Sequence, residues 1–405
     1  MLLKKLTVAV ALQTETWYPG ECYLPQICFI LPLSDSAVAF WRYINQKVLQ
    51  IRIAGTVFFL FFPYFAHHSL LMTKGFVFGK FLPFHKGHEA MIRYARVACD
   101  QLTILVCCSN TELISPEIRK SWISCTVADL TAVDIRIYNY NETELPNTSV
   151  SSESVSAAWA KVFRSLLPEV DLLVTSEPYG EYVASFMGIR HLPFNPARSE
   201  VPVAASMIRR DLAGYWSFLP PAVKATLALK VVLLGTESTG KSTLTDKLAN
   251  YFHGTAVQEA ARDIIPDSNE FTVKDLYTVA NAHAARIDAA VQGDSPLVFI
   301  DTDVYITISY GIHFYDTQIA VSPEIFDSNR ADLYLYLNND VPYFQDGTRL
   351  EQSERDELDA AHRRVLALYN IFYREINGSW EERLQVAIAL VAEAYALKQK
   401  TFFGE

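Results

Sequence analysis

The ten residues 79–88, Gly-Lys-Phe-Leu-Pro-Phe-His-Lys-Gly-His, combine glycine with two histidines in an arrangement suited to phosphate chemistry. His85 and His88 are three positions apart, at the predicted start of a helix. Free backbone N–H groups at a helix start favour an anion, and imidazole N–H groups donate to phosphate oxygens. The stretch therefore predicts a nucleotide phosphate site, for which a surface loop with two solvated histidines is the alternative. The candidate nucleotide contacts at its start are Gly79, Lys80 and Phe81.

A second candidate phosphate contact lies at 203–210, Val-Ala-Ala-Ser-Met-Ile-Arg-Arg. Ser206 is predicted to cap a helix that carries Arg209 in its first turn. A hydroxyl, free N–H groups and a guanidinium can then converge on one triphosphate. Capped basic helices are common, so this prediction depends on the helix lying beside the histidine loop.

The segment 235–242, Gly-Thr-Glu-Ser-Thr-Gly-Lys-Ser, matches G-x-x-x-x-G-K-[ST] at every fixed position. It lies between a buried strand pattern and an amphipathic helix pattern. In this motif the backbone N–H groups surround the β-phosphate, Lys241 neutralises phosphate charge, and the Ser242 hydroxyl binds Mg²⁺. A glycine-rich turn without a ligand is the alternative. The candidate nucleotide contacts are Gly235, Thr236, Glu237, Ser238, Thr239, Gly240, Lys241, Ser242 and Thr243.

Charged residues further along the chain could complete this second site. Asp301 and Asp303 follow a buried strand pattern, where one carboxylate suits Mg²⁺ and the other a sugar hydroxyl or its proton. Glu259 ends a short apolar run and is a further candidate acid. Arg349 and Arg355 could form a mobile lid that adds positive charge to a transferring phosphoryl group. Solvated strand ends and a charged surface helix are the competing interpretations.

From residue 72 onward, strand patterns alternate with helical patterns, which predicts an α/β fold with parallel sheets and helices on both faces. Both phosphate motifs then lie at the carboxyl ends of strands, where ligands collect. The motifs differ in kind, so the chain is a fusion rather than a duplication. Pro220 and Pro221 suggest a linker, and helices for packing are predicted at 354–375 and 381–399. The expected parts are an extension at 1–71, a first α/β domain at 72–224 and a P-loop domain at 225–405.

Composition limits the classes of partner. The formal net charge of −10 and the pI near 5.5 argue against a general affinity for nucleic acid, because phosphates attract basic surfaces. The six cysteines show no paired metal-ligand spacing, so they are interpreted as reduced thiols of a cytoplasmic protein.

Residues 1–71 are harder to assign. No Asp, Glu, Lys or Arg occurs from Ile53 to Thr73, a length that could span a bilayer. A proline and histidines within this stretch argue against a span. Basic residues before it would hold its N-terminal side in the cytoplasm, and the phosphate motifs after it would then face outward, away from ATP. We expect a working protein that starts at Met72, with a peripheral or membrane-anchoring role of 53–71 as the alternative.

The pattern G-x-F-x-P-x-H-x-G-H at 79–88 resembles the signature of the nucleotidyltransferase family, which joins a nucleotide α-phosphate to a phosphate acceptor and releases pyrophosphate. Residues 203–210 resemble that family's second signature, I-S-S-T-x-I-R, with Ser206 at the Thr position and Arg209 at the Arg position. Alanines replace the serine pair before Ser206, which removes two possible hydroxyl donors. The resemblance implies a Rossmann-like nucleotidyltransferase domain at 72–224.

A nucleotidyltransferase followed by a P-loop kinase resembles the NadR family of nicotinamide-nucleotide adenylyltransferases and ribosylnicotinamide kinases, from Met72 to about Lys400. The resemblance implies that ATP, with Mg²⁺, phosphorylates nicotinamide riboside to nicotinamide mononucleotide (NMN). A second ATP then adenylylates NMN to give NAD and pyrophosphate. The implied catalytic residues are His85, His88, Arg209 and Lys241, with Glu259, Asp301 or Asp303 as the kinase base, and the implied metal ligands are Ser242 and Asp301.

Some members of this family carry a helix-turn-helix repressor domain, to which residues 1–71 show no clear counterpart. We therefore expect small-molecule nucleotides and no nucleic acid as partners, and a homo-oligomeric protein. Two alternatives remain open. One is a nucleotidyltransferase for another phosphate acceptor, such as a pantetheine or flavin phosphate, joined to an unrelated kinase. The other is a nucleotide-sensing regulator with low turnover, associated with a membrane through 53–71.

Overall fold

The structure, a computed structural model, describes residues 49–53, 56–60, 72–146, 152–197, 199–265, 270–340 and 352–404. The chain divides into two compact units, Met1–Leu71 and Met72–Glu405. In the first unit, strand β1 (Leu49–Ile53) pairs antiparallel with β2 (Thr56–Leu60). Across the described ranges, no helix has the length and apolar character needed to cross a bilayer.

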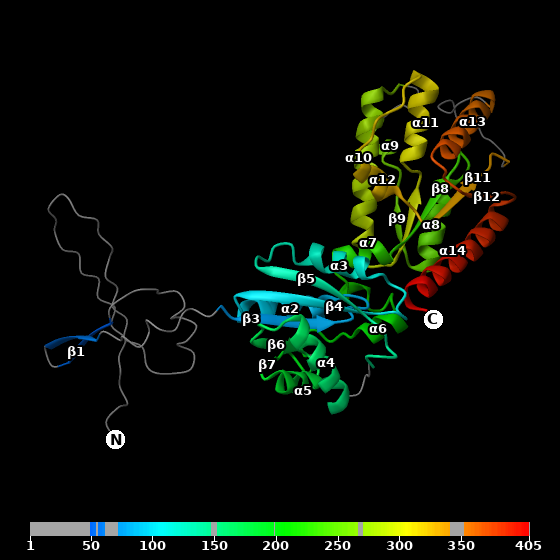
Figure 1. Ribbon diagram of the computed structural model, residues 1–405. Coiled ribbons are helices and arrows are strands. Elements are labelled where there is room, and N and C mark those ends of the chain that lie inside the picture. The colour runs from blue at the N-terminus through cyan, green and yellow to red at the C-terminus, as the bar shows by residue number, and fades with distance from the viewer. Residues whose placement is uncertain are drawn as a thin grey trace, which may run out of the picture. The chain divides into compact units, whose positions relative to one another are not determined.

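A five-stranded parallel sheet begins the second unit, with strand order β5-β4-β3-β6-β7 (Figure 1). Alternate side chains of β3 serve its two faces, because Val77 belongs to the core under α2 and α3 while Phe76 belongs to the core under α4 and α5. The elements are β3 (Lys74–Gly79), α2 (Lys86–Ala98), β4 (Gln101–Ser109), α3 (Pro116–Thr126), β5 (Val133–Tyr140), α4 (Glu153–Leu166), β6 (Leu172–Thr175), α5 (Tyr179–Met187), β7 (Arg190–Pro193) and α6 (Ala205–Arg210).

A second five-stranded parallel sheet follows, with strand order β12-β11-β8-β10-β9 (Figure 1). Helices α8 and α14 pack on one face, and α10 and α13 contribute to the core of the other. Its strands are β8 (Leu229–Leu234), β9 (Thr255–Val257), β10 (Leu297–Asp301), β11 (Leu333–Leu337) and β12 (Arg374–Ile376). Its helices are α8 (Lys241–Phe252), α9 (Ala261–Ile264), α10 (Val273–Val291), α11 (Val304–Tyr315), α12 (Pro323–Asn329), α13 (Gln352–Leu368) and α14 (Trp380–Phe403).

The predicted α/β fold with two parallel sheets is confirmed, and each phosphate motif follows the central strand of its sheet. The helix predicted at 354–375 is wrong at its end. Helix α13 stops at Leu368, and after a short connection β12 begins at Arg374, where the chain pairs in parallel with β11. A three-residue strand has too little periodicity to be distinguished from a helix end by pattern alone.

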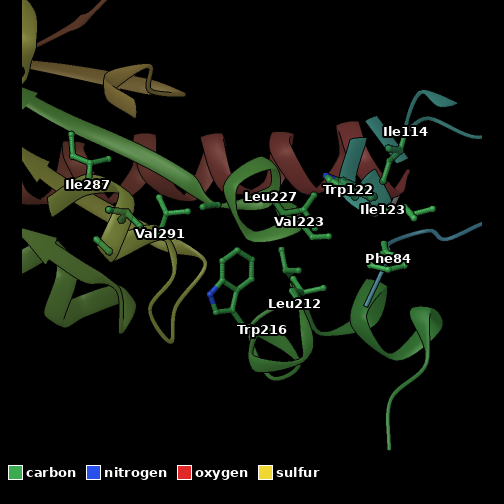
Figure 2. Packing of buried hydrophobic residues seen from close by; sticks show 14 of the residues in the cluster. Phe84, Ile114, Trp122, Ile123, Leu212, Trp216, Val223, Leu227, Ile287 and Val291 are labelled. Atoms are coloured by element: carbon green, nitrogen blue, oxygen red, sulfur yellow. The ribbon is translucent and has the colours of Figure 1, made fainter. Parts of the chain in front are cut away.

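The Pro220–Pro221 pair begins a helix instead of forming a linker. Pro221 is the first residue of α7 (Pro221–Leu227), where the missing N–H of proline costs no hydrogen bond. Val223 and Leu227 are buried between α3 of the first sheet and α10 of the second, in one continuous core (Figure 2). The boundary expected at 224/225 therefore falls inside helix α7.

Polar contacts strengthen this connection. Trp122 Nε1 donates to Thr226 Oγ1 at 2.8 Å, which joins α3 to α7. Lys224 Nζ donates to the carbonyl oxygens of Gln292 at 3.0 Å and Gly293 at 2.8 Å, just after the end of α10. A lysine at this position satisfies carbonyls that a helix end leaves without partners.

Candidate active sites

The first site, here called the histidine site, consists of residues 79–88 and the α6 residues beside them. His85 is the N-cap of α2, and its Nδ1 accepts hydrogen bonds from the backbone N–H groups of Gly87 at 3.1 Å and His88 at 3.3 Å. Because Nδ1 is an acceptor, the neutral ring carries its proton on Nε2. The side chain is thus held in the tautomer that can donate to a phosphate from Nε2.

The two imidazoles are stacked on each other. The ring centroids of His85 and His88 are 3.7 Å apart and the planes differ by 20°. Phe81 and Phe84, both buried, place their rings 5.0 and 5.8 Å from that of His88. Phe81 therefore supports His88 from the core, and any contact it makes with a nucleotide would come from its backbone.

Helix α6 reaches the histidine loop through an arginine. Arg209 Nη1 donates to the carbonyl oxygen of Leu82 at 2.7 Å, so the two sequence motifs are brought together. The predicted cap is wrong, however. The N-cap of α6 is Ala204, no side chain caps it, and Ser206 is an exposed residue inside the first turn. Capping by Ser206 would require the helix to begin two residues later.

A partly buried charge network holds the start of the histidine loop. Lys80 Nζ lies 2.9 Å from Glu112 Oε1 and 3.1 Å from Glu142 Oε1. Arg119, 1% exposed, contacts Glu112 Oε2 at 2.6 Å and donates to the Lys80 carbonyl oxygen at 3.0 Å. Burial lowers the pKa of Lys80, but the two glutamates outweigh it and the net pKa is raised. Sequence reasoning missed Glu112, whose position just after β4 is its only signal.

A cavity of about 90 Å³ opens beside Gly79 and Lys80. Four of its lining residues are aromatic, and the rings of Tyr140 and Trp159 meet edge to face with centroids 4.9 Å apart. Burial raises the pKa of Tyr140 to about 12, so its phenol is neutral. The lining residues are Phe78, Gly79, Lys80, Cys107, Tyr140, Ser152, Val155, Ser156, Trp159, Tyr179 and Val183. Such walls suit a flat ring.

The second site, here called the P-loop site, lies between β8 and α8. Gly235 has φ +135 and Gly240 has φ +88, conformations that favour glycine. A Cβ atom on Gly235 would lie 2.5 Å from the backbone oxygen of Leu337, so the loop packs directly on the end of β11. Lys241 begins α8, and its Nζ donates to the Thr236 carbonyl oxygen at 2.9 Å. The lysine therefore folds back over the loop.

Hydroxyl and carboxylate oxygens meet at the end of β10. Ser242 Oγ donates to Asp301 Oδ2 at 2.5 Å, and Asp301 is fully buried. Arg262 bonds to Ser242 Oγ and lies 3.6 Å from Asp301 Oδ2. Hard oxygen ligands of this kind fit Mg²⁺, which usually takes one or two protein oxygens and completes its shell with water and phosphate. No cluster of three or more His, Cys, Asp or Glu side chains suits a metal within the described ranges.

Glu259 is the second carboxylate of this site. Its Oε2 lies 3.8 Å from Arg262 Nε. Burial raises the pKa of Glu259; Lys241 and Arg262 oppose the rise, and Asp301 adds to it. A glutamate with a raised pKa near the P-loop lysine is suited to accept a proton from a hydroxyl.

Asp303 has a different environment. It is the N-cap of α11, and its Oδ1 accepts from the backbone N–H groups of Tyr305 at 3.0 Å and Ile306 at 3.1 Å. Its side chain is 1% exposed, and burial raises its pKa to about 7. These contacts hold the side chain at the start of its own helix, and its role toward a substrate stays a prediction.

Two buried arginines, Arg355 and Arg383, donate hydrogen bonds to backbone carbonyl oxygens of the P-loop. Arg355 is 1% exposed and donates from Nη2 to the Glu237 carbonyl oxygen at 3.0 Å, so the interpretation as a surface helix residue is wrong. Arg349 lies outside the described residues. Sequence reasoning missed Arg383, which is 1% exposed and donates to the Thr239 carbonyl oxygen at 3.1 Å. Its signal is a place on the buried stripe of α14, four residues before Ala387.

The fold and these sites define a class: an α/β protein with a nucleotidyltransferase-type histidine loop on one parallel sheet and a phosphate-binding P-loop on a second. Comparison with known proteins agrees. A family model described as an AAA domain matches residues 230–383. The chain is 29% identical over 344 residues to the trifunctional NAD biosynthesis/regulator protein NadR of Escherichia coli strain K12, covering 79% of this chain and 83% of the relative.

The same protein of Salmonella typhimurium strain LT2 is 29% identical over 298 residues, covering 68% of this chain and 71% of the relative. Two crystal structures of NadR share the fold. The complex with NR has a TM-score of 0.53 at 19% identity, and the complex with NAD and AMP-PNP has 0.51 at 20%; each covers 80% of this chain and 96% of the neighbour. The chain is NadR-like, as the sequence motifs predict.

Proposed function

We propose that this protein is a bifunctional enzyme of NAD formation. In the P-loop site it phosphorylates nicotinamide riboside with ATP to give NMN and ADP. In the histidine site it adenylylates NMN with a second ATP to give NAD and pyrophosphate. The observation that carries the proposal is the occurrence of two different candidate phosphate-binding motifs, a histidine loop and a P-loop, in one unit that resembles NadR. The similar solved structures hold NR, NAD and AMP-PNP, which are a substrate, a product and an ATP analogue of these reactions.

The kinase step transfers the γ-phosphoryl group of ATP to the 5′-hydroxyl of the riboside. Loop N–H groups and Lys241 hold the β- and γ-phosphates, and Glu259 takes the hydroxyl proton while ADP leaves. Ser242 and Asp301 would hold Mg²⁺, which supplies a positive charge shared between the phosphates. Arg262, next to both residues, adds charge at the same edge of the sheet.

The adenylyl step needs no base, because the phosphate monoester of NMN is already a nucleophile. Its oxygen attacks the α-phosphate of ATP, the bond to the β-phosphate breaks, and pyrophosphate leaves. His85, His88 and Arg209 stabilise the charge that develops on the α-phosphate. The Arg209 guanidinium bonds to Leu82 through one nitrogen, which aims its remaining N–H groups from a fixed position.

The cavity beside Gly79 and Lys80 is the proposed binding site for the nicotinamide ring of the phosphate acceptor. A pyridine ring can stack on its walls, and Lys80 lies at its edge. An acceptor with a flexible, non-aromatic arm would use these walls poorly. The cavity thus supports a nicotinamide nucleotide over a pantetheine phosphate. A cytoplasmic location and a homo-oligomeric state stay predictions from the sequence.

Label tracing tests the proposal. When the purified chain is given nicotinamide riboside and ATP labelled at the γ-phosphate, label should enter NMN and then NAD. With ATP labelled at the α-phosphate, label should enter NAD and the ADP left by the kinase step, but not NMN. Formation of neither product by a chain that still binds ATP would favour the nucleotide-sensing regulator. Transfer of adenylate to a flavin or pantetheine phosphate, but not to NMN, would show that the acceptor assignment is wrong.

A further inference from the structure

An exposed tryptophan lies against the last glycine of the P-loop. Trp380 is the first residue of α14, and its six-membered ring packs so closely on Gly240 that a methyl group there would overlap it. Nearly half of the Trp380 surface, 48%, is nevertheless exposed. Helices α14 and α8 lie side by side on the same face of the second sheet (Figure 1). A large apolar ring is thus presented to solvent at the rim of the phosphate loop.

The ring is held rigidly from both ends of its helix turn. Ser379 and Glu382 form a capping box, with the Ser379 N–H and Oγ each 2.8 Å from Glu382 Oε2. The Arg383 guanidinium lies 5.6 Å from the ring centroid of Trp380. Arg383 also donates to the Thr239 carbonyl oxygen of the P-loop, so the same residue ties the ring and the loop together.

We propose that the exposed face of Trp380 binds the purine base of the nucleoside triphosphate whose phosphates occupy the P-loop. This inference rests on the proposed phosphate binding by that loop. A triphosphate held by the loop must lead its sugar and base out over the rim, where a flat apolar face is available. Every base has a π-face, and stacking on an aromatic side chain strengthens binding about five- to 150-fold. Packing of the ring on Gly240 and Arg383 lowers the ordering cost of that contact.

Substitutions separate base stacking from support of the loop. Trp380→Phe keeps an aromatic face, whereas Trp380→Leu keeps bulk against Gly240 without one. Phe372→Ala is the matched control, because Phe372 is 88% exposed in the turn between α13 and β12. The KM for ATP in riboside phosphorylation reports on the P-loop site alone. We expect Trp380→Leu to raise this KM at least fivefold with kcat nearly unchanged, and Trp380→Phe and Phe372→Ala to change it less than about twofold.

Binding measurements complete the test. Inorganic tripolyphosphate carries the phosphates without the base, so its inhibition constant should be equal in the wild type and in Trp380→Leu. ATP should also quench tryptophan fluorescence in the wild type, and that part of the quenching should be absent in Trp380→Phe. An unchanged KM for ATP, or an equal loss of ATP and tripolyphosphate binding, would overturn the inference.

These readouts distinguish the inference from the proposed function. Quenching by ATP through Trp380 in a protein that does not phosphorylate the riboside would support the stacking and contradict the proposed substrate. Riboside phosphorylation whose KM for ATP is unchanged by Trp380→Leu would support the proposed substrate and contradict the stacking.

Discussion

The histidine site and the P-loop site both follow the central strand of a parallel sheet, but the carboxylates of the two sites lie in different environments. In the histidine site, Glu112 and Glu142 are tied to Lys80, and Glu112 is also tied to Arg119. In the P-loop site, the paired Ser242 and Asp301 form the oxygen-rich side. There Glu259 lies 3.8 Å from Arg262, yet burial still raises its pKa.

This difference matches the two proposed nucleophiles. A phosphate monoester is itself an anion and would be repelled by carboxylates without basic partners. Carboxylates that form ion pairs with Lys and Arg do not oppose its binding. A sugar hydroxyl needs a proton acceptor, so a carboxylate must remain available to it. The two proposed ATP sites therefore differ in whether their acidic residues serve in ion pairs or can accept a proton.

The largest effect should come from removing the available carboxylate. Glu259→Gln should lower kcat for riboside phosphorylation by about 10² to 10⁴, the range for a general base, and leave NMN adenylylation unchanged. Asp263→Asn is the control, because Asp263 lies in the same segment and pairs with Arg286 at the surface. Steady-state kinetics of each half-reaction would measure this. Equal rates for Glu259→Gln and the wild type would remove Glu259 from the mechanism.

A paired carboxylate should matter for stability instead. Arg119→Ala leaves Glu112 buried without one of its partners, and breaking a buried ion pair costs about 3–5 kcal/mol. Arg93→Ala should cost less than about 1 kcal/mol, because the Arg93–Asp129 pair is exposed to solvent. Denaturant unfolding gives both free energies. Similar values for the two variants would show that the Arg119 network contributes no more than a surface pair.

Asp303, the buried N-cap of α11, should make the stability of the protein depend on pH. Its pKa is raised to about 7 in the folded chain, above the usual 3.8, so the folded state binds the extra proton. Stability from this group is full below about pH 4 and is lost as pH rises to about 7, a change of roughly 4 kcal/mol. Asp303→Asn should remove this pH dependence and keep the helix cap. A difference curve of unfolding free energy against pH that is flat between these limits would contradict it.

The smallest effect concerns the aromatic cavity. Tyr179→Leu removes one wall and should raise the KM for NMN about tenfold, within the range for ring stacking, with kcat nearly unchanged. Riboside phosphorylation serves as the internal control, since Tyr179 begins α5, which packs on the first sheet and not on the second. An unchanged KM would mean that the pyridine ring binds elsewhere.

Sequence patterns predicted the strands and the P-loop because apolar runs and a fixed motif carry local information. They failed where tertiary partners decide. Arg355 and Arg383 are buried because P-loop carbonyl oxygens accept from them, and no local pattern shows those oxygens. The α6 helix starts after Ala204, whose side chain gives no capping signal. Pro221 begins a helix because that helix packs against α3 of the first sheet and α10 of the second.

Crossed substitution of the two sites tests whether each half-reaction occurs at its own phosphate site. Lys241→Ala should lower riboside phosphorylation by about 10² or more and leave NAD formation from added NMN intact. His88→Ala should do the opposite, so that NMN accumulates from the riboside and little NAD forms. If either single change reduced both half-reactions equally in a folded protein, the account of two separate phosphate sites would be contradicted.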